Sequence, residues 1–206
     1  MKKGSSVITT VIFDLGEVYL QGFKGVNKRL APILNLDPEA VRSALRGDEN
    51  LTALFLGEIS ENEYWSRVIK RTGWNISVEK MEAIMRENFV GLEGTREIIE
   101  ELKAQEYKLG LLSIHSKEWV EYCDRKFDYH KLFHSVLYSY EVHALKPEKR
   151  VYEMILERLG SSAGESLFID NVEINLVPAR ELGMQTILFT DSKALKADLA
   201  SLGITV

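Results

Sequence analysis

The sequence has few of the features that mark secreted, membrane-spanning or nucleic-acid-binding proteins. It contains one cysteine, Cys123, in 206 residues, which excludes an internal disulfide framework and is typical of a reducing compartment. No apolar run approaches the roughly 18 residues of a membrane span. The net charge is −5 with both signs interspersed, and Lys and Arg form no block that would bind a phosphate backbone. We expect a cytoplasmic protein, monomeric or homodimeric, without a nucleic-acid or membrane partner.

The most informative stretch is an apolar run from Val7 to Phe13 that leads directly into Asp14. Its β-branched and aromatic residues are typical of a buried parallel strand, which would carry Asp14 at its carboxyl end. In open α/β sheets, ligands bind at that end of the strands. A carboxylate in this position can act as a nucleophile, as a metal ligand or as both. Polar residues at the ends of neighbouring strands would therefore meet Asp14 at one edge of the sheet.

Between residues 20 and 91 the apolar residues recur at helical spacing, and no run is typical of a strand. Asp37-Pro38 has the pattern of a helix start, and residues Ser60 to Glu63 have that of a capping box. The pattern predicts a compact block of four or five helices, which we call the helical insert.

After Gly91 the pattern alternates between strands and helices, which indicates a parallel, doubly wound, Rossmann-like sheet of the α/β class. The predicted strands are Lys108–Ser113, Ser135–Tyr140, Ser166–Asp170 and Gln185–Phe189, and the predicted helices are Thr95–Gln105, Trp119–Lys126, Pro147–Leu159 and Asn175–Leu182. The chain is thus expected to have a core of residues 1–19 and 92–206. An all-helical domain of residues 20–91 is inserted after the first strand.

Polar residues stand at three later points where predicted strands end. Ser113 ends the second strand as Asp14 follows the first, and its hydroxyl can donate to an anion. Lys146 comes just before Pro147, a predicted helix start, and can project over the same edge of the sheet. Asp170 and Asn171 follow the apolar part of the fourth strand. Two carboxylates at neighbouring strand ends repel each other unless a metal cation or a lysine lies between them.

This ordered set of residues resembles the haloacid dehalogenase-like hydrolase superfamily, and the resemblance covers essentially the whole chain. The helical insert matches the cap domain of that family. Gly57 to Ser60, together with Lys146-Pro147 and Val151-Tyr152, is similar to the branch that contains sugar-phosphate phosphatases and the phosphatase domain of soluble epoxide hydrolases.

The resemblance implies a magnesium-dependent phosphatase acting on a small phosphorylated metabolite. Asp14 would attack phosphorus and form an aspartyl-phosphate, which water then hydrolyses. Ser113 and Lys146 would bind the transferring phosphoryl group. Mg²⁺ would be held by Asp14, by the backbone carbonyl of Gly16 and by Asp170 or Asn171. Such a site positions the phosphoryl group and neutralises its charge, which is what phosphoryl transfer requires.

Two positions depart from the pattern of these phosphatases. Gly16 stands where most of them have an aspartate that acts as general acid and base, a role typically worth about 10² to 10⁴ in rate. Glu17 is one residue out of register, and His115 is a candidate substitute for the missing acid. Asn171 replaces a second acid that normally binds the metal, so we expect weaker Mg²⁺ binding. A substrate with a good leaving group, such as a sugar 1-phosphate or an acyl phosphate, would need less help from an acid.

Two other functions remain open. The replacements at Gly16 and Asn171 suit a degenerate, non-catalytic binding or interaction protein. A 2-haloacid dehalogenase is third, because dehalogenases also lack the acid at Gly16 but carry a threonine where this chain has Val18. Arg42 and Arg46 in the helical insert are candidates for binding an anion, although solvated helix positions are the stronger interpretation.

Overall fold

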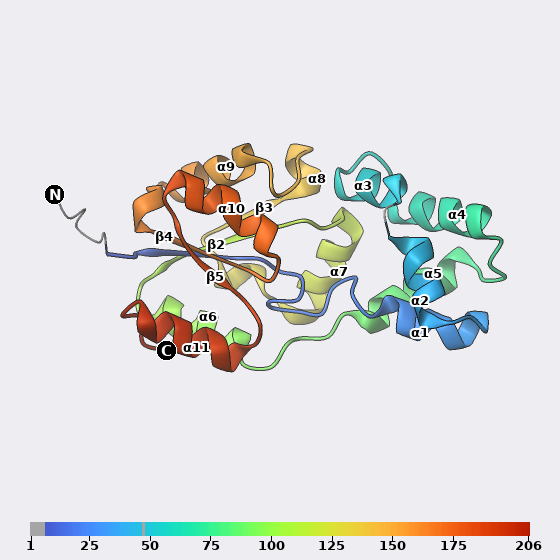
Figure 1. The fold of residues 1–206 in the computed structure, drawn as a ribbon, viewed down its shortest axis with the longest axis horizontal. Coiled ribbons are helices and arrows are strands. Elements are labelled where there is room, and N and C mark those ends of the chain that lie inside the picture. Colours follow the sequence, from blue (N-terminus) through green and yellow to red (C-terminus); the bar gives the residue numbers. More distant parts are fainter. Residues whose placement is uncertain (1–6, 47) are drawn as a thin grey trace.

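A computed structural model, which describes residues 7–46 and 48–206, shows a parallel sheet at the centre of the protein. Within those residues the sheet has five strands in the order β3-β2-β1-β4-β5. The strands are β1 (Thr10–Phe13), β2 (Lys108–Ser113), β3 (Ser135–Tyr138), β4 (Ser166–Asp170) and β5 (Gln185–Leu188). The predicted doubly wound α/β class is therefore confirmed (Figure 1).

The first strand lies in the middle of the sheet and is buried along its whole length. Its last residue, Phe13, pairs with Leu111 of β2 on one side and with Ile169 of β4 on the other. Because all three strands run in the same direction, the residues that follow them meet at one edge of the sheet. The fold therefore brings the segments after β1, β2 and β4 together.

Helices cover both faces of the sheet. They are α6 (Thr95–Ala104), α7 (Lys117–Phe127), α8 (Ser139–Val142), α9 (Lys149–Leu159), α10 (Glu173–Leu182) and α11 (Ser192–Ser201). Ile12 and Phe168 point to one face, where they pack with Tyr152 of α9 and with residues of α10. The alternate residues of β1 and β4 point to the other face, which α6 and α11 cover (Figure 1). Strands β1 and β4 therefore bury apolar residues on both sides, as expected for the centre of a parallel sheet between two helical layers.

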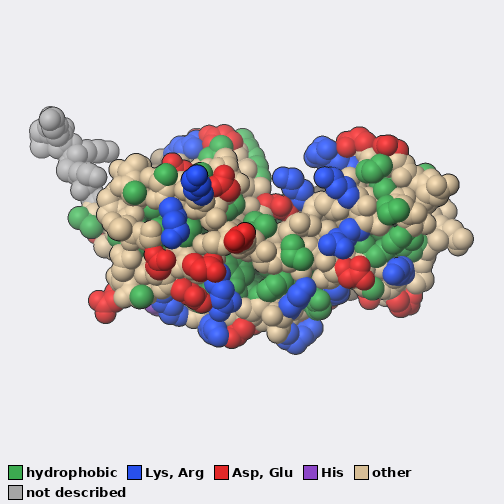
Figure 2. Space-filling view, turned by 90° about the horizontal axis from the view of Figure 1, so that it is seen from below, with side chains coloured by type: hydrophobic (Ala, Val, Ile, Leu, Met, Phe, Trp, Pro, Cys, Tyr) green, Lys and Arg blue, Asp and Glu red, His purple; other side chains and the backbone are tan. Residues whose placement is uncertain are grey.

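The helical insert forms a second lobe beside the core (Figure 1). It contains α1 (Val26–Leu34), α2 (Pro38–Leu45), α3 (Glu49–Phe55), α4 (Glu61–Thr72) and α5 (Val78–Asn88). The side chain of Asp37 accepts hydrogen bonds from the first turn of α2, and that of Ser60 accepts one from α4. We call this lobe the cap. Figure 2 shows a notch between the cap and the core.

The chain enters and leaves the cap along two paired segments. Gln21 donates a backbone hydrogen bond to Val90 over 2.8 Å, and Leu92 donates one to Tyr19 over 2.9 Å. Leu20 and Gly91 form an antiparallel bridge between these bonds. We propose residues 20 and 91 as the limits of the cap because the two crossings lie side by side here.

Several predicted boundaries were wrong by one to three residues, and three of these differences bear on the sheet and on Lys146. The first strand begins at Thr10 rather than Val7, because both neighbouring strands begin opposite Thr10. The third strand ends at Tyr138, opposite the last residue of β2, and the chain then turns into α8. Helix α9 begins at Lys149 rather than at Pro147, which follows Lys146 through a cis peptide bond.

The prediction also missed one element at the end of the chain, where α11 follows the strand that we expected to be the last element. Only Leu195 and Leu199 of this helix are buried, so its periodic pattern is weak. None of the helices in residues 7–46 and 48–206 has the length and apolar character that a bilayer crossing requires.

Candidate active site

The site is built around Asp14, directly after β1. Its backbone N–H donates to the carbonyl of Ile169, and its Oδ1 accepts from the backbone N–H of Leu15 over 2.8 Å. The residue is only 8% exposed. Burial raises the pKa of Asp14 to about 6, although the Lys146 ammonium opposes this rise and Asp170 adds to it.

Lys146 lies between the carboxylates of Asp14 and Asp170, where its positive charge offsets the repulsion between them. Its Nζ is 2.9 Å from Oδ1 of Asp14 and 2.6 Å from Oδ2 of Asp170, and it also donates to the carbonyl of Leu112. Burial strongly opposes the charged form, but the two carboxylates outweigh it and raise the pKa of Lys146. The ammonium therefore stays charged and holds the ends of β1 and β4 together.

Asp170 is fully buried, and protein groups engage both of its oxygens. Oδ1 accepts from the backbone N–H of Val172 over 2.8 Å, and Oδ2 accepts from Lys146. The side-chain amide of Asn175 donates to both oxygens, and its own backbone carbonyl accepts from the hydroxyl of Tyr152. By contrast, no hydrogen bond within the described residues reaches Oδ2 of Asp14. Asp14 is thus the carboxylate with an oxygen left for chemistry, and Asp170 positions Lys146.

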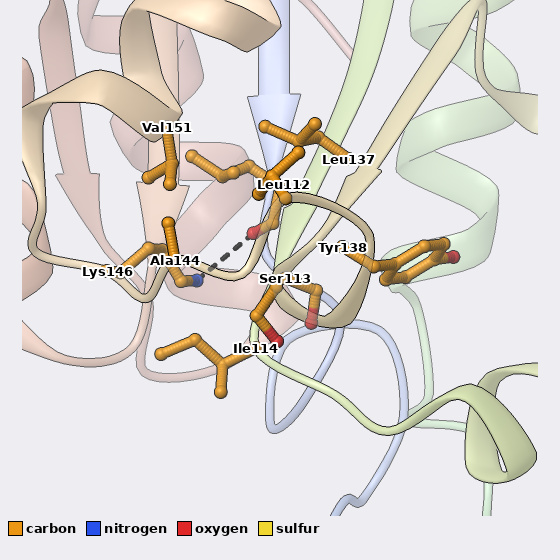
Figure 3. A pocket seen from close by; sticks show the side chains of 10 residues that line it. Leu112, Ser113, Ile114, Leu137, Tyr138, Ala144, Lys146 and Val151 are labelled. Carbon is orange, nitrogen blue, oxygen red and sulfur yellow. Dashed lines mark hydrogen bonds between the residues drawn. The ribbon is translucent and has the colours of Figure 1, made fainter. Parts of the chain in front are cut away.

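Ser113 stands at the end of β2, the strand next to β1, and follows Leu112, whose carbonyl accepts from Lys146. Its hydroxyl is buried but has no hydrogen-bond partner in the structure. Such a group costs about 1 to 3 kcal/mol unless something pairs with it. Ser113 and Lys146 line a cavity of about 10 Å³ (Figure 3), which is about the volume that one water needs. The unpaired hydroxyl is therefore available to a ligand.

The predicted metal-binding residues follow β1 and β4, which are neighbours in the sheet. Among residues 7–46 and 48–206, no cluster of three or more His, Cys, Asp or Glu side chains could hold a metal ion. Magnesium, however, is often held by only one or two carboxylates and keeps several waters. Asp14 Oδ2, the carbonyl of Gly16 and the amide oxygen of Asn171 are donors of this kind. They fit a magnesium ion better than Asp170, whose oxygens are already engaged.

Neither Glu17 nor His115 is placed or protonated so that it could act as the general acid that is missing at Gly16. The side chain of Glu17 accepts a hydrogen bond from the backbone of Gly22 over 2.9 Å and thereby closes its own loop. His115 is 4% exposed and its ring packs against Phe89 and Trp119. Burial lowers the pKa of His115 to about 4, so the imidazole is neutral near pH 7. It therefore lacks the acidic second proton of an imidazolium, and its remaining N–H is too weak an acid to serve as general acid at that pH.

The structure also packs the segment after β2 against the entrance to the cap. Between β2 and the first turn of α7, the side chains of His115, Ser116 and Trp119 each bury a polar atom that has no partner. Phe23, at the entrance to the cap, stacks on Trp119 with 5.6 Å between ring centroids. A single sequence gives no signal for this arrangement, because Phe23 and Trp119 meet only through the tertiary fold.

Two of the relatives with detectable sequence similarity illustrate the range of the matches. The bifunctional epoxide hydrolase 2 of Rattus norvegicus is 36% identical over 67 residues, which cover 32% of this chain and 12% of that protein. Flavin mononucleotide hydrolase 1 of Arabidopsis thaliana, a chloroplast protein, is 25% identical over 134 residues, covering 65% of this chain and 54% of the relative. The chain thus matches about half or less of the length of these proteins.

Solved structures share the fold. One is a HAD family enzyme, BT-2542 of Bacteroides thetaiotaomicron, in complex with magnesium and inorganic phosphate. It superposes with a TM-score of 0.76 at 23% identity, over 89% of this chain and 95% of that one. A solved dehalogenase superposes with a TM-score of 0.68 at 17% identity, over 87% of this chain and 83% of that one.

The sequence model of one family covers most of the chain. It matches residues 11–189, from the middle of β1 to just beyond β5, and so includes the cap and every residue of the site. Together with the shared fold, this match shows that the chain belongs to the haloacid dehalogenase-like hydrolase family.

Proposed function

We propose that this protein is a magnesium-dependent phosphatase that acts on a small phosphorylated metabolite through an aspartyl-phosphate. The observation that carries this proposal is the arrangement around Asp14. Its free Oδ2 lies beside a charged, buried Lys146, and the neighbouring strand presents the unpaired hydroxyl of Ser113. A nucleophile flanked by a cation and a hydroxyl donor suits a phosphoryl group that carries negative charge on its oxygens.

Each residue has a distinct role in this proposal. Asp14 attacks phosphorus, and the bond from phosphorus to the ester oxygen breaks as the new bond forms. Lys146 and Ser113 donate to the phosphoryl oxygens, while Asp170 keeps Lys146 in place. A magnesium ion held by Asp14, Gly16 and Asn171 would supply further charge neutralisation.

The comparisons support a phosphate ester as substrate. One relative is a flavin mononucleotide hydrolase, and a structural neighbour was solved with magnesium and phosphate. Because Gly16 supplies no acid and His115 is neutral, we propose an ester or anhydride whose leaving group needs little protonation. We further propose that the protein works in the cytoplasm as a monomer or homodimer, with no nucleic acid or membrane as partner.

The decisive experiment is hydrolysis of p-nitrophenyl phosphate with and without Mg²⁺. This substrate has a good leaving group, so the missing acid matters least. We expect Mg²⁺-dependent turnover by the wild type and a loss of at least about 10³-fold in Asp14→Asn, since the amide cannot act as the nucleophile. Asp198→Asn, at an exposed site on α11, is the matched control and should keep full activity. Full activity of Asp14→Asn would contradict the proposal.

The second candidate is a binding protein that has lost its chemistry, and Gly16 and Asn171 are the observations that favour it. It predicts phosphate binding without turnover in the same assay. A dehalogenase is the third candidate, because solved dehalogenases share the fold. It predicts metal-independent release of chloride from 2-chloropropionate. Wild-type turnover of p-nitrophenyl phosphate that needs Mg²⁺ would exclude both alternatives.

A further inference from the structure

A second hollow lies in the cap, away from Asp14. It is formed by the segment that leads into α1 and by helix α2, and it has a volume of about 530 Å³. This volume falls within the range of about 300 to 1,000 Å³ that is typical of sites for small molecules. The hollow contains none of the residues assigned to the phosphatase reaction.

The charge of this hollow is opposite to that of the whole protein. Its lining contains four cationic side chains, from Lys24, Lys28, Arg42 and Arg46, and one carboxylate, from Glu39. The protein as a whole has a net charge of −5. Figure 2 shows several Lys and Arg side chains on the cap beside the notch. A concentration of positive charge around a concave surface attracts anions.

Most of these cations are not neutralised by the protein. Arg42 is paired with Glu39 at 3.2 Å, and both side chains remain partly exposed. Within the described residues, no salt bridge or hydrogen bond engages the side chains of Lys24, Lys28 or Arg46. The nearest further carboxylate, Glu17, interacts with Lys24 but is held by the backbone of Gly22. The hollow thus keeps an excess of positive charge available to a ligand.

The rest of the lining is apolar and well anchored. Phe23, Val26, Pro38 and Leu45 contribute to it. The ring of Phe23 is stacked between Trp65 of the cap and Trp119 of the core, with centroid distances of 6.4 and 5.6 Å. An apolar surface whose aromatic ring is already fixed loses little side-chain entropy when a ligand packs on it.

We propose that this hollow binds a small organic anion, a molecule with a carboxylate, sulfonate or phosphate group on an apolar body. The anionic group contacts Arg42, Arg46 and the two lysines, and the apolar body packs against Phe23 and Leu45. The sequence marked Arg42 and Arg46 as anion-binding candidates, and the fold adds the lysines and the apolar lining that make them a site. This inference does not depend on phosphatase activity, because its test measures binding.

The test is a fluorescence titration of the full-length protein with 8-anilinonaphthalene-1-sulfonate, which joins a sulfonate to an apolar body. We expect saturable binding to one site. The double variant Arg42→Gln/Arg46→Gln should bind it about tenfold more weakly, because each charge-assisted contact is lost. Lys24→Gln/Lys28→Gln should also weaken binding, and it serves as a second variant if the first does not fold. Far-UV circular dichroism checks that each variant is folded.

Two controls separate this site from general binding to apolar surface. Arg125→Gln removes an exposed arginine of α7 outside the hollow and should leave the affinity unchanged. N-phenyl-1-naphthylamine, which has the same apolar body without the sulfonate, should bind the wild type at least about tenfold more weakly. The proposal is wrong if the arginine and lysine variants bind the sulfonate as tightly as the wild type. It is also wrong if the neutral compound binds equally well.

Discussion

Gly16 is the residue whose replacement should reveal most about catalysis. A Cβ atom built on it would meet no other atom within 4 Å. The Cβ of an aspartate therefore fits here without displacing its neighbours. It would stand two residues after Asp14, at the position where related phosphatases have their general acid.

We expect Gly16→Asp to raise the turnover of an alkyl phosphate, whose leaving group needs a proton, by about 10- to 100-fold. The turnover of p-nitrophenyl phosphate should change much less, since its leaving group departs without help. The comparison of the two substrates in one variant separates acid catalysis from a general change in the site. An equal change for both substrates would show that residue 16 does not act as an acid.

His115 should make the stability of the protein depend on pH. Its folded-state pKa of about 4 lies below its ordinary value of 6.5 because the ring is buried. As the pH falls below about 6.5, His115 becomes protonated in the unfolded chain. In the folded protein the same imidazole stays neutral until the pH reaches about 4. Acid therefore favours unfolding, by up to about 3 kcal/mol at pH 4 from this residue alone.

Urea denaturation between pH 4.5 and 7 measures this effect. His115→Gln removes the titrating group, so the free energy of unfolding should vary less with pH than in the wild type. His143→Gln is the matched control, since its side chain is exposed, and it should keep the wild-type dependence. Identical pH profiles for wild type and His115→Gln would contradict the prediction.

Residues that follow apolar strands were the part of the site that the sequence could predict. Asp14, Ser113 and Asp170 each end or follow a run that only a buried strand explains, and parallel strands bring such residues together. The hydrogen bonds that distinguish Asp14 from Asp170 could not be predicted. They depend on Asn175 and Val172, whose distances to the carboxylate are set by the turn between β4 and α10.

At the scale of whole elements, strong periodicity and helix-capping residues gave correct predictions, while tertiary pairing decided the rest. The helices α2 and α4 begin where Asp37 and Ser60 indicate, because these caps act locally. The limits of β1 and β3 depend instead on where the neighbouring strands begin and end. No local pattern contains that information.

Helix α11 shows that the spacing of apolar residues cannot predict every helix. It has two buried apolar residues one turn apart and otherwise faces solvent, so it has little apolar stripe to detect. Its most useful local signal is Asp191, whose side chain accepts a hydrogen bond from the N–H of Ala194. A search for capping residues after the last strand would have found this helix.

At the scale of the whole molecule, the position of the cap relative to the core bears on access to the site. Asp14 is only 8% exposed, and the small cavity beside Ser113 and Lys146 is lined by core residues alone. The cap also contacts the core at its far end, where His143 lies 2.7 Å from the carbonyl of Leu56. Because Asp14 is almost fully buried, we predict that substrate reaches it through movement of the cap away from the core.

A reversible cross-link between the lobes tests this movement. A Cβ atom built on Gly57 of the cap would lie 3.1 Å from the Cβ of Tyr140 in the core, slightly less than a disulfide spans. Gly57 has a φ of 72°, so cysteine there costs about 1 kcal/mol. We expect oxidised Gly57→Cys/Tyr140→Cys to lose at least about tenfold in turnover and to regain it with dithiothreitol.

The single variants are the controls for this cross-link. The natural Cys123 is buried, so oxidation of either single variant should leave turnover unchanged. Full activity of the oxidised double variant, with the disulfide verified by mass spectrometry, would show that substrate enters without separation of the cap from the core.

The paired segments at residues 19–21 and 90–92 have a consequence for the order of folding. Strands β1 and β2 pair directly, yet the whole cap separates them in the chain. Bringing β1 and β2 together closes this long loop, which costs conformational entropy. The pairing of the two strands is favourable only when its contacts outweigh that cost. A cap that has already folded holds Leu20 beside Gly91, which leaves only short connections to β1 and β2. We infer that early folding of the cap speeds the assembly of the sheet.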